Sequence, residues 1–129
     1  MEYDISLLPA DCYIVVNKSI ITDQDKRYLI SFYEPIMGHL ATTLYLTLLN
    51  DLENNKQISR DFTHHHLMSI LKCPLKTIKE ARLALESLGL LRTFIKKGNI
   101  NNYIYEIYSP LNPMEFFSHP ILNIVLYNN

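Results

Sequence analysis

The chain has 129 residues, of which 48% are hydrophobic and 19% are charged, and its formal net charge is -1. This length supports one compact domain and is too short for two. The hydrophobic content excludes intrinsic disorder, the three glycines and six prolines exclude collagen-like or low-complexity structure, and the near-neutral charge excludes a strongly basic nucleic-acid arm.

The amino-terminal half predicts one strand and two helices. Segment 11–18 is rich in β-branched and aromatic residues and is continuously apolar, which indicates a strand whose two faces both need cover. Thr22 and Asp25 have the spacing of a capping box, so a short helix is expected from there to about residue 33. Pro35 should stop or kink this path, and leucines at four-residue intervals predict a longer amphipathic helix over 36–53.

The next segment predicts two helices joined by a tight turn. A short strand is expected over 57–60, and the polar residues 61–63 offer caps for a helix over 64–71. Apolar residues at three-and-four spacing predict a second helix over 75–88, and Gly89 suits a left-handed helix terminus.

A β-hairpin is expected after these helices, because β-prone runs over 91–96 and 103–108 flank a loop of glycine and asparagines that tolerate positive φ angles. The order of elements is that of a winged helix, so the predicted fold class is α+β and mainly helical. We expect one domain over 1–129, made of an amino-terminal strand or arm (1–20), a winged-helix core (22–109) and a carboxy-terminal helical extension (110–129).

The sequence contains no pattern that indicates catalysis, a cofactor or a metal. Three consecutive histidines, 64–66, cannot close on one ion, because successive helical residues point about 100° apart. We expect one ring to be packed and the others solvated. A Gly-rich phosphate loop and an activated nucleophile motif are both missing from the sequence. The protein is therefore predicted not to be an enzyme.

Charge is unevenly distributed along the chain. Segment 72–97 carries seven basic and two acidic side chains, a net charge of +5 that is set against -6 elsewhere. At 100° per residue, three lysines form one outward stripe on the second helix, with Leu83 among them, whereas Arg82 borders the core and can reach Glu86. The candidate DNA contacts are Lys72, Lys76, Lys79, Lys96 and Lys97.

Any DNA contact through these lysines should be weak and blind to sequence. The outward positions of the second helix offer lysines, glutamates, a leucine and a serine, whereas base readout needs Arg, Asn or Gln. Binding should instead be directed at phosphates and sensitive to salt.

The two ends of the chain carry apolar residues beyond what a lone winged helix needs to cover. These are the predicted strand around 13–16 and the segment 121–127, which is apolar on nearly every helical face. We expect a homo-oligomer, a dimer or a tetramer. The candidate residues for self-association are Tyr13, Val15, Leu122, Val125 and Leu126.

The location expected for this chain is cytoplasmic. Its longest mostly apolar stretch, 40–49, is shorter than the roughly 20 residues that cross a membrane. Its amino terminus is acidic, where a targeting peptide would carry positive charge. Cys12 and Cys73 have no paired spacing, which favours reduced thiols.

Three groups of residues resemble one family of replication proteins. They are Tyr33-x-Pro35-x-x-Gly38-x-x-Ala41-x-x-Leu44-Tyr45, then Glu80-Ala81-Arg82-x-x-Leu85-Glu86-x-Leu88-Gly89-Leu90-Leu91-Arg92-Thr93, and then Tyr103-x-Tyr105 with Pro110-Leu111-x-Pro113-x-x-Phe116-Phe117. Together they resemble the amino-terminal module of the bacterial primosomal DnaB/DnaD replication-initiation family. The opening Leu8-Pro9-Ala10-Asp11 is similar to the DnaB side, that of replication initiation and membrane attachment proteins.

The resemblance implies a role in loading the replicative helicase at origins and restarted forks. It implies that this module serves self-association and contact with other primosome proteins. Family members are usually longer, so the chain is expected to be a fragment, and membrane association is expected only of a full-length protein. The alternative hypothesis is a winged-helix transcriptional regulator that reads a palindromic DNA site through the helix over 75–88 and the wing.

Overall fold

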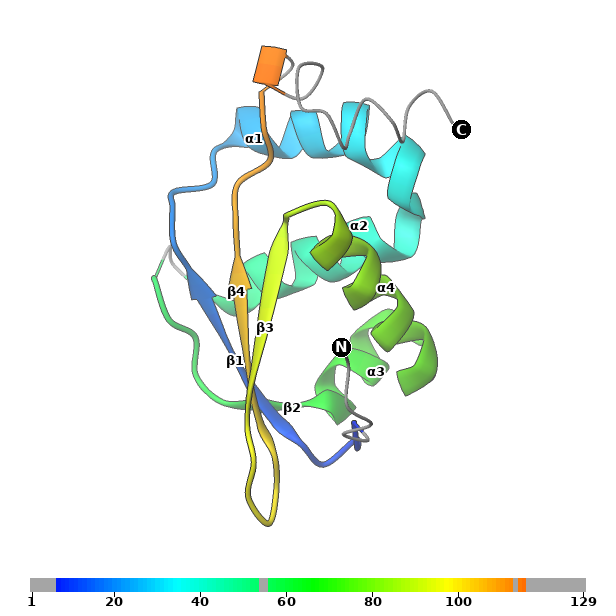
Figure 1. Cartoon of the computed structure of the whole chain (residues 1–129), viewed down its shortest axis with the longest axis vertical. Helices are drawn as coiled ribbons and strands as arrows, with labels where there is room; N and C mark the ends of the chain where they lie inside the picture. Colours follow the sequence, from blue (N-terminus) through cyan, green and yellow to red (C-terminus); the bar gives the residue numbers. More distant parts are fainter. Residues whose placement is uncertain (1–6, 54–55, 113, 116–129) are drawn as a thin grey trace.

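A computed structural model describes residues 7–53, 56–112 and 114–115 of the chain. Its centre is a four-stranded sheet in the order β2-β1-β4-β3 (Figure 1). Strand β1 pairs in parallel with β4 and antiparallel with β2, and β3 and β4 form an antiparallel hairpin. The strands are β1 (Cys12–Asn17), β2 (Phe62–Thr63), β3 (Leu91–Lys96) and β4 (Asn102–Ile107).

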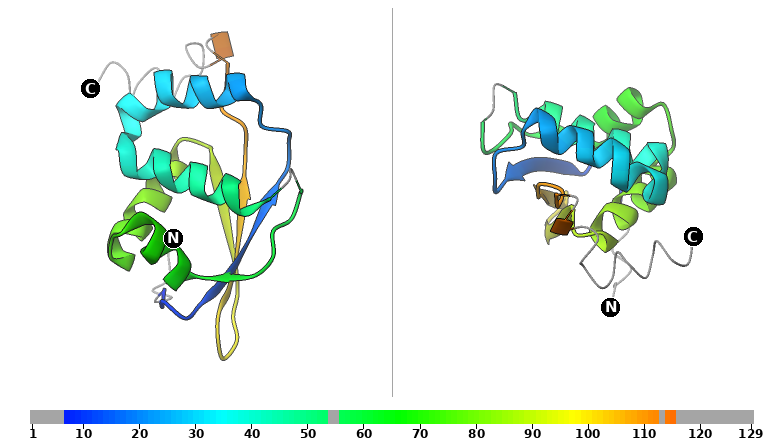
Figure 2. Two further views of the ribbon diagram at one scale, coloured as in Figure 1. Left: turned by 180° about the vertical axis from the view of Figure 1, so that it is seen from behind. Right: turned by 90° about the horizontal axis from the view of Figure 1, so that it is seen from above.

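The helices confirm the predicted winged helix. Helices α3 and α4 form the helix-turn-helix, and the hairpin of β3 and β4 is the wing (Figure 1). The long helix α2 lies across one face of the sheet, as the views in Figures 1 and 2 show. The helical elements are α1 (Asp23–Tyr28), a π-helical turn (Leu29–Tyr33), α2 (Glu34–Asp51), α3 (His64–Leu71) and α4 (Leu75–Ser87).

The capping box predicted at the start of α1 is present. The Thr22 hydroxyl accepts a hydrogen bond from the Asp25 amide at 3.1 Å, and the Asp25 carboxylate accepts one from the Thr22 amide at 2.9 Å. Two backbone donors that have no partner within the helix are thus satisfied. The helical path continues through the π-helical turn into α2, which the sequence did not indicate.

The bend in the helical path lies at Gly38, so its predicted position at Pro35 is wrong. Pro35 occupies the first turn of α2, where a missing backbone donor costs nothing. Gly38 has φ 87° and ψ 169°, a region of backbone space that is essentially restricted to glycine. A side chain here would meet no atom within 4 Å, so this requirement comes from the backbone and not from crowding.

The short strand expected over 57–60 is displaced along the chain, since β2 consists of Phe62–Thr63. Residues 57–59 nevertheless run beside β1. The Asn17 amide donates to the Gln57 carbonyl at 2.8 Å, the Ser59 amide donates to the Val15 carbonyl at 2.9 Å, and Ile58 forms a single bridge with Val16. The outer edge of β1 is therefore covered by the chain itself.

Residues Tyr13 and Val15 lie in the core and not on a surface. They are 1% and 0% exposed, and they pack with the buried leucines of α2, Leu44 and Leu48. The hypothesis that these two side chains form a self-association surface is contradicted by this burial. A continuous apolar run does not reveal which of its alternating faces turns inward, and β1 turns these residues to the helices.

The second half of the domain largely follows the prediction. Helix α3 has the predicted bounds, and α4 ends one residue early, before Gly89 with φ 77°. Thr63 is the N-cap of α3, but its side chain makes no capping hydrogen bond. Within the described segments, no helix combines the length and hydropathy that spanning a bilayer requires. The other three self-association candidates, Leu122, Val125 and Leu126, lie outside the described residues.

Candidate functional site

The lysines of the helix-turn-helix lie on its outward side. Lys72 is the C-cap of α3 in the left-handed conformation, with φ 54° and ψ 44°. Lys72 and Lys76 are exposed and Lys79 is half-buried, whereas the opposite side of α4 buries Ile78 and Leu85. Lys76 and Lys79 therefore lie on the side of α4 that the helical angles predict, whereas Lys72 precedes α4 in a turn to which those angles do not apply.

The two lysines of the wing lie at its far end. Lys96 is the last residue of β3, Lys97 follows it in the hairpin loop, and both are exposed. Figure 1 shows this loop projecting beyond the rest of the domain. Within the described part of the chain, none of the five candidate lysines forms an ion pair, so their ammonium groups are free to meet phosphates.

The exposed side of α4 carries no arginine, asparagine or glutamine, the residues that most often read bases by bidentate hydrogen bonds. Glu80 and Ser87 are exposed, and Leu83 is 43% exposed. Arg82 is 4% exposed and its Nε lies 3.5 Å from a carboxylate oxygen of Glu86, as the sequence predicted. The arginine of α4 is therefore withdrawn into the domain and is not available on this surface.

A buried histidine joins three parts of the fold. His64 is 0% exposed, its Nδ1–H donates to the Asp11 carbonyl at 2.7 Å, and its Nε2 accepts from the Tyr105 hydroxyl at 2.6 Å. Burial lowers the pKa of His64, so the ring is neutral at pH 7 and links α3 to β4 and to the start of β1.

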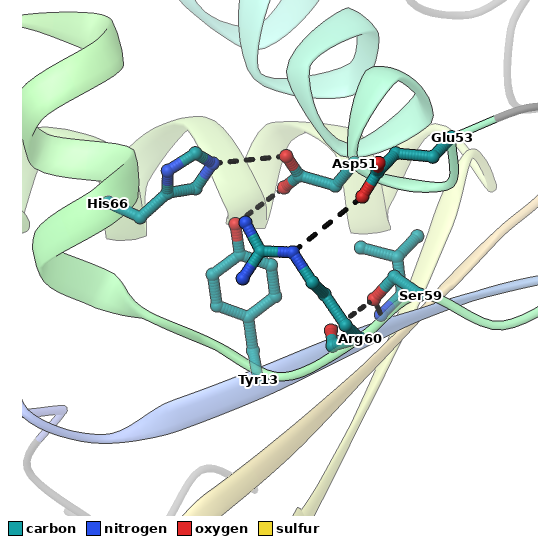
Figure 3. A network of polar contacts seen from close by, with 7 residues as sticks. Tyr13, Asp51, Glu53, Ser59, Arg60 and His66 are labelled. Atoms are coloured by element: carbon teal, nitrogen blue, oxygen red, sulfur yellow. Dashed lines mark hydrogen bonds and ion pairs between the residues drawn. The ribbon is translucent and has the colours of Figure 1, made fainter.

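Figure 3 shows a second polar cluster at the end of α2. Asp51 is 4% exposed and accepts hydrogen bonds from the Tyr13 hydroxyl at 2.5 Å and from His66 Nε2–H at 3.0 Å. Burial raises the pKa of Tyr13, which keeps the phenol protonated as the donor. Beside it Arg60 pairs with Glu53 at 3.6 Å. The cluster fastens α2 to β1 and α3, which is a structural role.

Sequence reasoning missed Asp51, although a signal was available. Its partners lie 38 and 15 positions away along the chain, which no local pattern relates. However, Asp51 continues the buried face of α2 three residues after Leu48, so a carboxylate stands where helical spacing predicts an apolar side chain. Within the described residues, no group of three or more His, Cys, Asp or Glu side chains is placed to hold a metal ion.

A groove of about 950 Å³ lies between the loop after β1 and the second half of α2. Ile21, Leu46 and Leu49 line it together with Lys18 and Lys26. Both ammonium groups are paired with carboxylates, at 3.4 and 3.8 Å. The described lining residues include no histidine and no cysteine.

Known proteins similar to this chain agree with the fold. Residues 7–129 match the family described as DnaB N-terminal winged helix domain. The chain is 25% identical over 127 residues to the replicative helicase loading/DNA remodeling protein DnaB of Staphylococcus aureus (strain NCTC 8325 / PS 47), a match that covers 98% of this chain and 27% of that protein. The crystal structure of primosome protein DnaB from Geobacillus stearothermophilus is 32% identical with a TM-score of 0.85, and covers 95% of this chain and 47% of that one.

Proposed function

Since this chain belongs to the family of DnaB N-terminal winged helix domains, we propose that it is an interaction and self-association module of a primosomal protein that helps to load the replicative helicase. The observation that carries this proposal is the family match over nearly the whole chain. The chain spans 27% of its curated relative and 47% of the solved structure, so loading by a longer protein is part of the proposal. The role consists of binding, in the cytoplasm, and involves no catalysis by this domain.

The loading role predicts direct contact with replication proteins. The test mixes the purified chain with purified replicative helicase and with each other primosome protein, and measures complexes by size-exclusion chromatography and light scattering. A complex with at least one of them supports the proposal. A chain that elutes alone from every mixture overturns it.

Self-association should depend on the carboxy-terminal apolar segment, because Tyr13 and Val15 are buried. Leu122→Asp is expected to convert an oligomer into a monomer at tens of micromolar, since a carboxylate cannot be buried unpaired in an apolar interface. Sedimentation velocity measures the change. Leu83→Asp, at a 43% exposed position on α4, is the matched control and should leave the oligomer intact. A wild-type monomer at this concentration would contradict the assembly part of the proposal.

DNA contact by this domain should be weak, sequence-blind and directed at phosphates. Lys76→Ala/Lys79→Ala is expected to weaken duplex binding and to reduce the slope of log K against log salt by about 2, because two fewer counterions are released. Fluorescence anisotropy with several duplex sequences at two salt concentrations measures both effects. Lys26→Ala/Lys56→Ala removes the same charge beside the groove and should leave the slope unchanged.

The alternative function, a transcriptional regulator, is favoured by the exposed lysines on α4 and the wing. It predicts a different result in the same measurement. A regulator binds its own site about a thousandfold or more tighter than random duplex. Such a preference would favour the regulator and overturn the primosomal proposal, whereas equal binding to all duplexes supports the primosomal proposal.

A further inference from the structure

One face of the sheet points away from the helices. Figures 1 and 2 show α2 against the other face, and no helix of the described residues lies over this one. Because side chains alternate along a strand, β1 turns Tyr13 and Val15 into the core and Ile14 and Val16 outward. The same alternation in β4 and β3 places Ile104 and Phe94 on the outward side.

The register of the strands brings these outward side chains into cross-sheet rows. Phe94 lies opposite Ile104, which in turn lies opposite Ile14, so the three form one apolar row. Val16 begins the next row and has Ile58 beside it on the far side. Phe94 is 42% exposed and Ile58 is 58% exposed. We call this surface, together with the charged residues described next, the outer sheet face.

Charged side chains flank the apolar row on both sides. In one neighbouring row Arg92 lies opposite Glu106, which also pairs with Lys18 at 3.4 Å. In the other neighbouring row, Lys96 lies opposite Asn102. Three cations against one carboxylate give this face a net charge of +2, although the whole chain carries -1. The Arg92 guanidinium lies 5.1 Å from the centre of the Phe94 ring, so cationic and apolar groups form one continuous surface.

We propose that the outer sheet face binds an acidic amphipathic segment of another protein, whose apolar side chains cover Ile104 and Phe94 and whose carboxylates meet Arg92 and Lys96. The inference rests on the proposed function and names the chemistry of one partner. Two observations support it. Burial of the apolar row would contribute binding free energy, and the surrounding cations are complementary in charge to an acidic sequence.

A second copy of the chain fits this face less well. Two copies meeting here would bring the same net positive charge together, and like charges across an interface are unfavourable. An acidic segment instead brings carboxylates to Arg92 and Lys96, whereas Lys18 is already paired with Glu106. The charge of the face therefore separates this interface from the self-association proposed for the carboxy-terminal segment.

Nucleic acid also fits less well. Single-stranded bases bind to proteins mainly by stacking on aromatic faces, whereas Ile14, Val16 and Ile104 are aliphatic. Arg92 already lies over the ring of Phe94. These features favour a polypeptide over a nucleotide chain.

The test uses the isotopically labelled 129-residue chain and three probes. Two synthetic amphipathic peptides of about 18 residues, five helical turns, share one leucine stripe, but the flanks are glutamate in one and lysine in the other. The third probe is a thymidine oligonucleotide of similar length. In nuclear magnetic resonance shift mapping, the glutamate peptide should shift the resonances of Ile14, Ile104 and Phe94. The lysine peptide should leave these resonances unchanged.

Two variants and one matched control sharpen the result. Phe94→Glu and Lys96→Glu should each lower the affinity of the chain for the glutamate peptide by about tenfold or more. Leu83→Glu, at a position with nearly the same exposure (43% against 42%), should leave its affinity unchanged. Lys96 is exposed, so Lys96→Glu is expected to fold. It therefore still tests the inference if Phe94→Glu fails to fold. Equal losses in the variants and the control would overturn the inference.

Other outcomes identify a different occupant. Binding of the oligonucleotide to these strands in preference to the glutamate peptide would assign the face to nucleic acid, and loss of self-association in Phe94→Glu would assign it to a second copy. Either result overturns the inference. If the wild-type chain and Phe94→Glu bind primosome proteins equally, this inference fails while the proposed function stands. If the wild-type chain binds none, the proposed function fails.

Discussion

Val15→Asp is expected to abolish folding of the chain. Val15 is 0% exposed, its amide donates to the Ser59 hydroxyl, its carbonyl accepts from the Ser59 amide, and it lies opposite Tyr105 of β4. An unpaired carboxylate in this core costs several kcal/mol, of the same order as the total stability of about 5–15 kcal/mol that a domain possesses. Circular dichroism and amide shift dispersion measure the loss of structure.

Val16→Asp is the matched control for this experiment. Val16 is the next residue of β1 but lies on the outer sheet face, half-buried and opposite Glu106 of β4, with Arg92 one strand further across the sheet. A carboxylate there reaches water but lies opposite another carboxylate, so this variant should still fold, with a loss of about 2 kcal/mol. A Val15→Asp chain that folds as a monomer would contradict the buried position and restore Val15 as a self-association residue.

His64→Ala is expected to lower the free energy of unfolding by about 2–4 kcal/mol. The substitution leaves a cavity in a fully buried site and removes the ring that bonds both the Asp11 carbonyl and the Tyr105 hydroxyl. Urea denaturation followed by circular dichroism measures the change. His65→Ala, one residue on and exposed, is the control and should differ from wild type by less than about 0.5 kcal/mol.

The same histidine should make the wild-type chain sensitive to mild acid. Burial lowers the pKa of His64 in the folded state, whereas the unfolded ring keeps a pKa of about 6.5. The unfolded state therefore takes up the proton first as the pH falls. The contribution of His64 is complete above about pH 6.5 and declines below it, by up to about 1.4 kcal/mol per pH unit, down to the folded pKa. Unfolding curves of His64→Ala should lack this component, and those of His65→Ala should retain it.

Elements whose signals are local were predicted well from the sequence. The capping box needs only Thr22 and Asp25, and the bounds of α3 follow from residues within one or two turns. Gly89 likewise marks the end of α4 by its own backbone freedom. The lysine stripe belongs to the same class, because helical angles alone determine which residues share a side of α4.

Features that depend on distant partners could not be predicted in this way. The parallel pairing of β1 with β4, and the shift of β2 to Phe62–Thr63, are set by packing between remote segments. Pro35 is a strong local signal for a break, but the bend is at Gly38, where the helix must turn to cross the sheet. The hydrogen bonds of Asp51 with Tyr13 and His66 also arise only after three elements have met.

The hypothesis about the amino-terminal strand was half correct. Its continuous apolar run does have two faces to cover, and the domain covers the face of Tyr13 and Val15 by itself. Ile14 and Val16 lie on the other face, which is part of the outer sheet face. Periodicity could not assign the two faces, since all four residues are apolar, and only the positions of the helices distinguish them.

The parallel pairing of β1 with β4 also dictates when the domain can form during translation. A hydrogen bond between Asn101 and Asp11 spans 90 positions, and of the strands in the described residues the first to be synthesised, β1, pairs with the last, β4. Until β4 is synthesised, β1 has only the two-residue β2 and its flanking loop as a partner. Contacts of such long sequence separation slow folding, so nascent chains expose a bare apolar strand that chaperones are suited to hold.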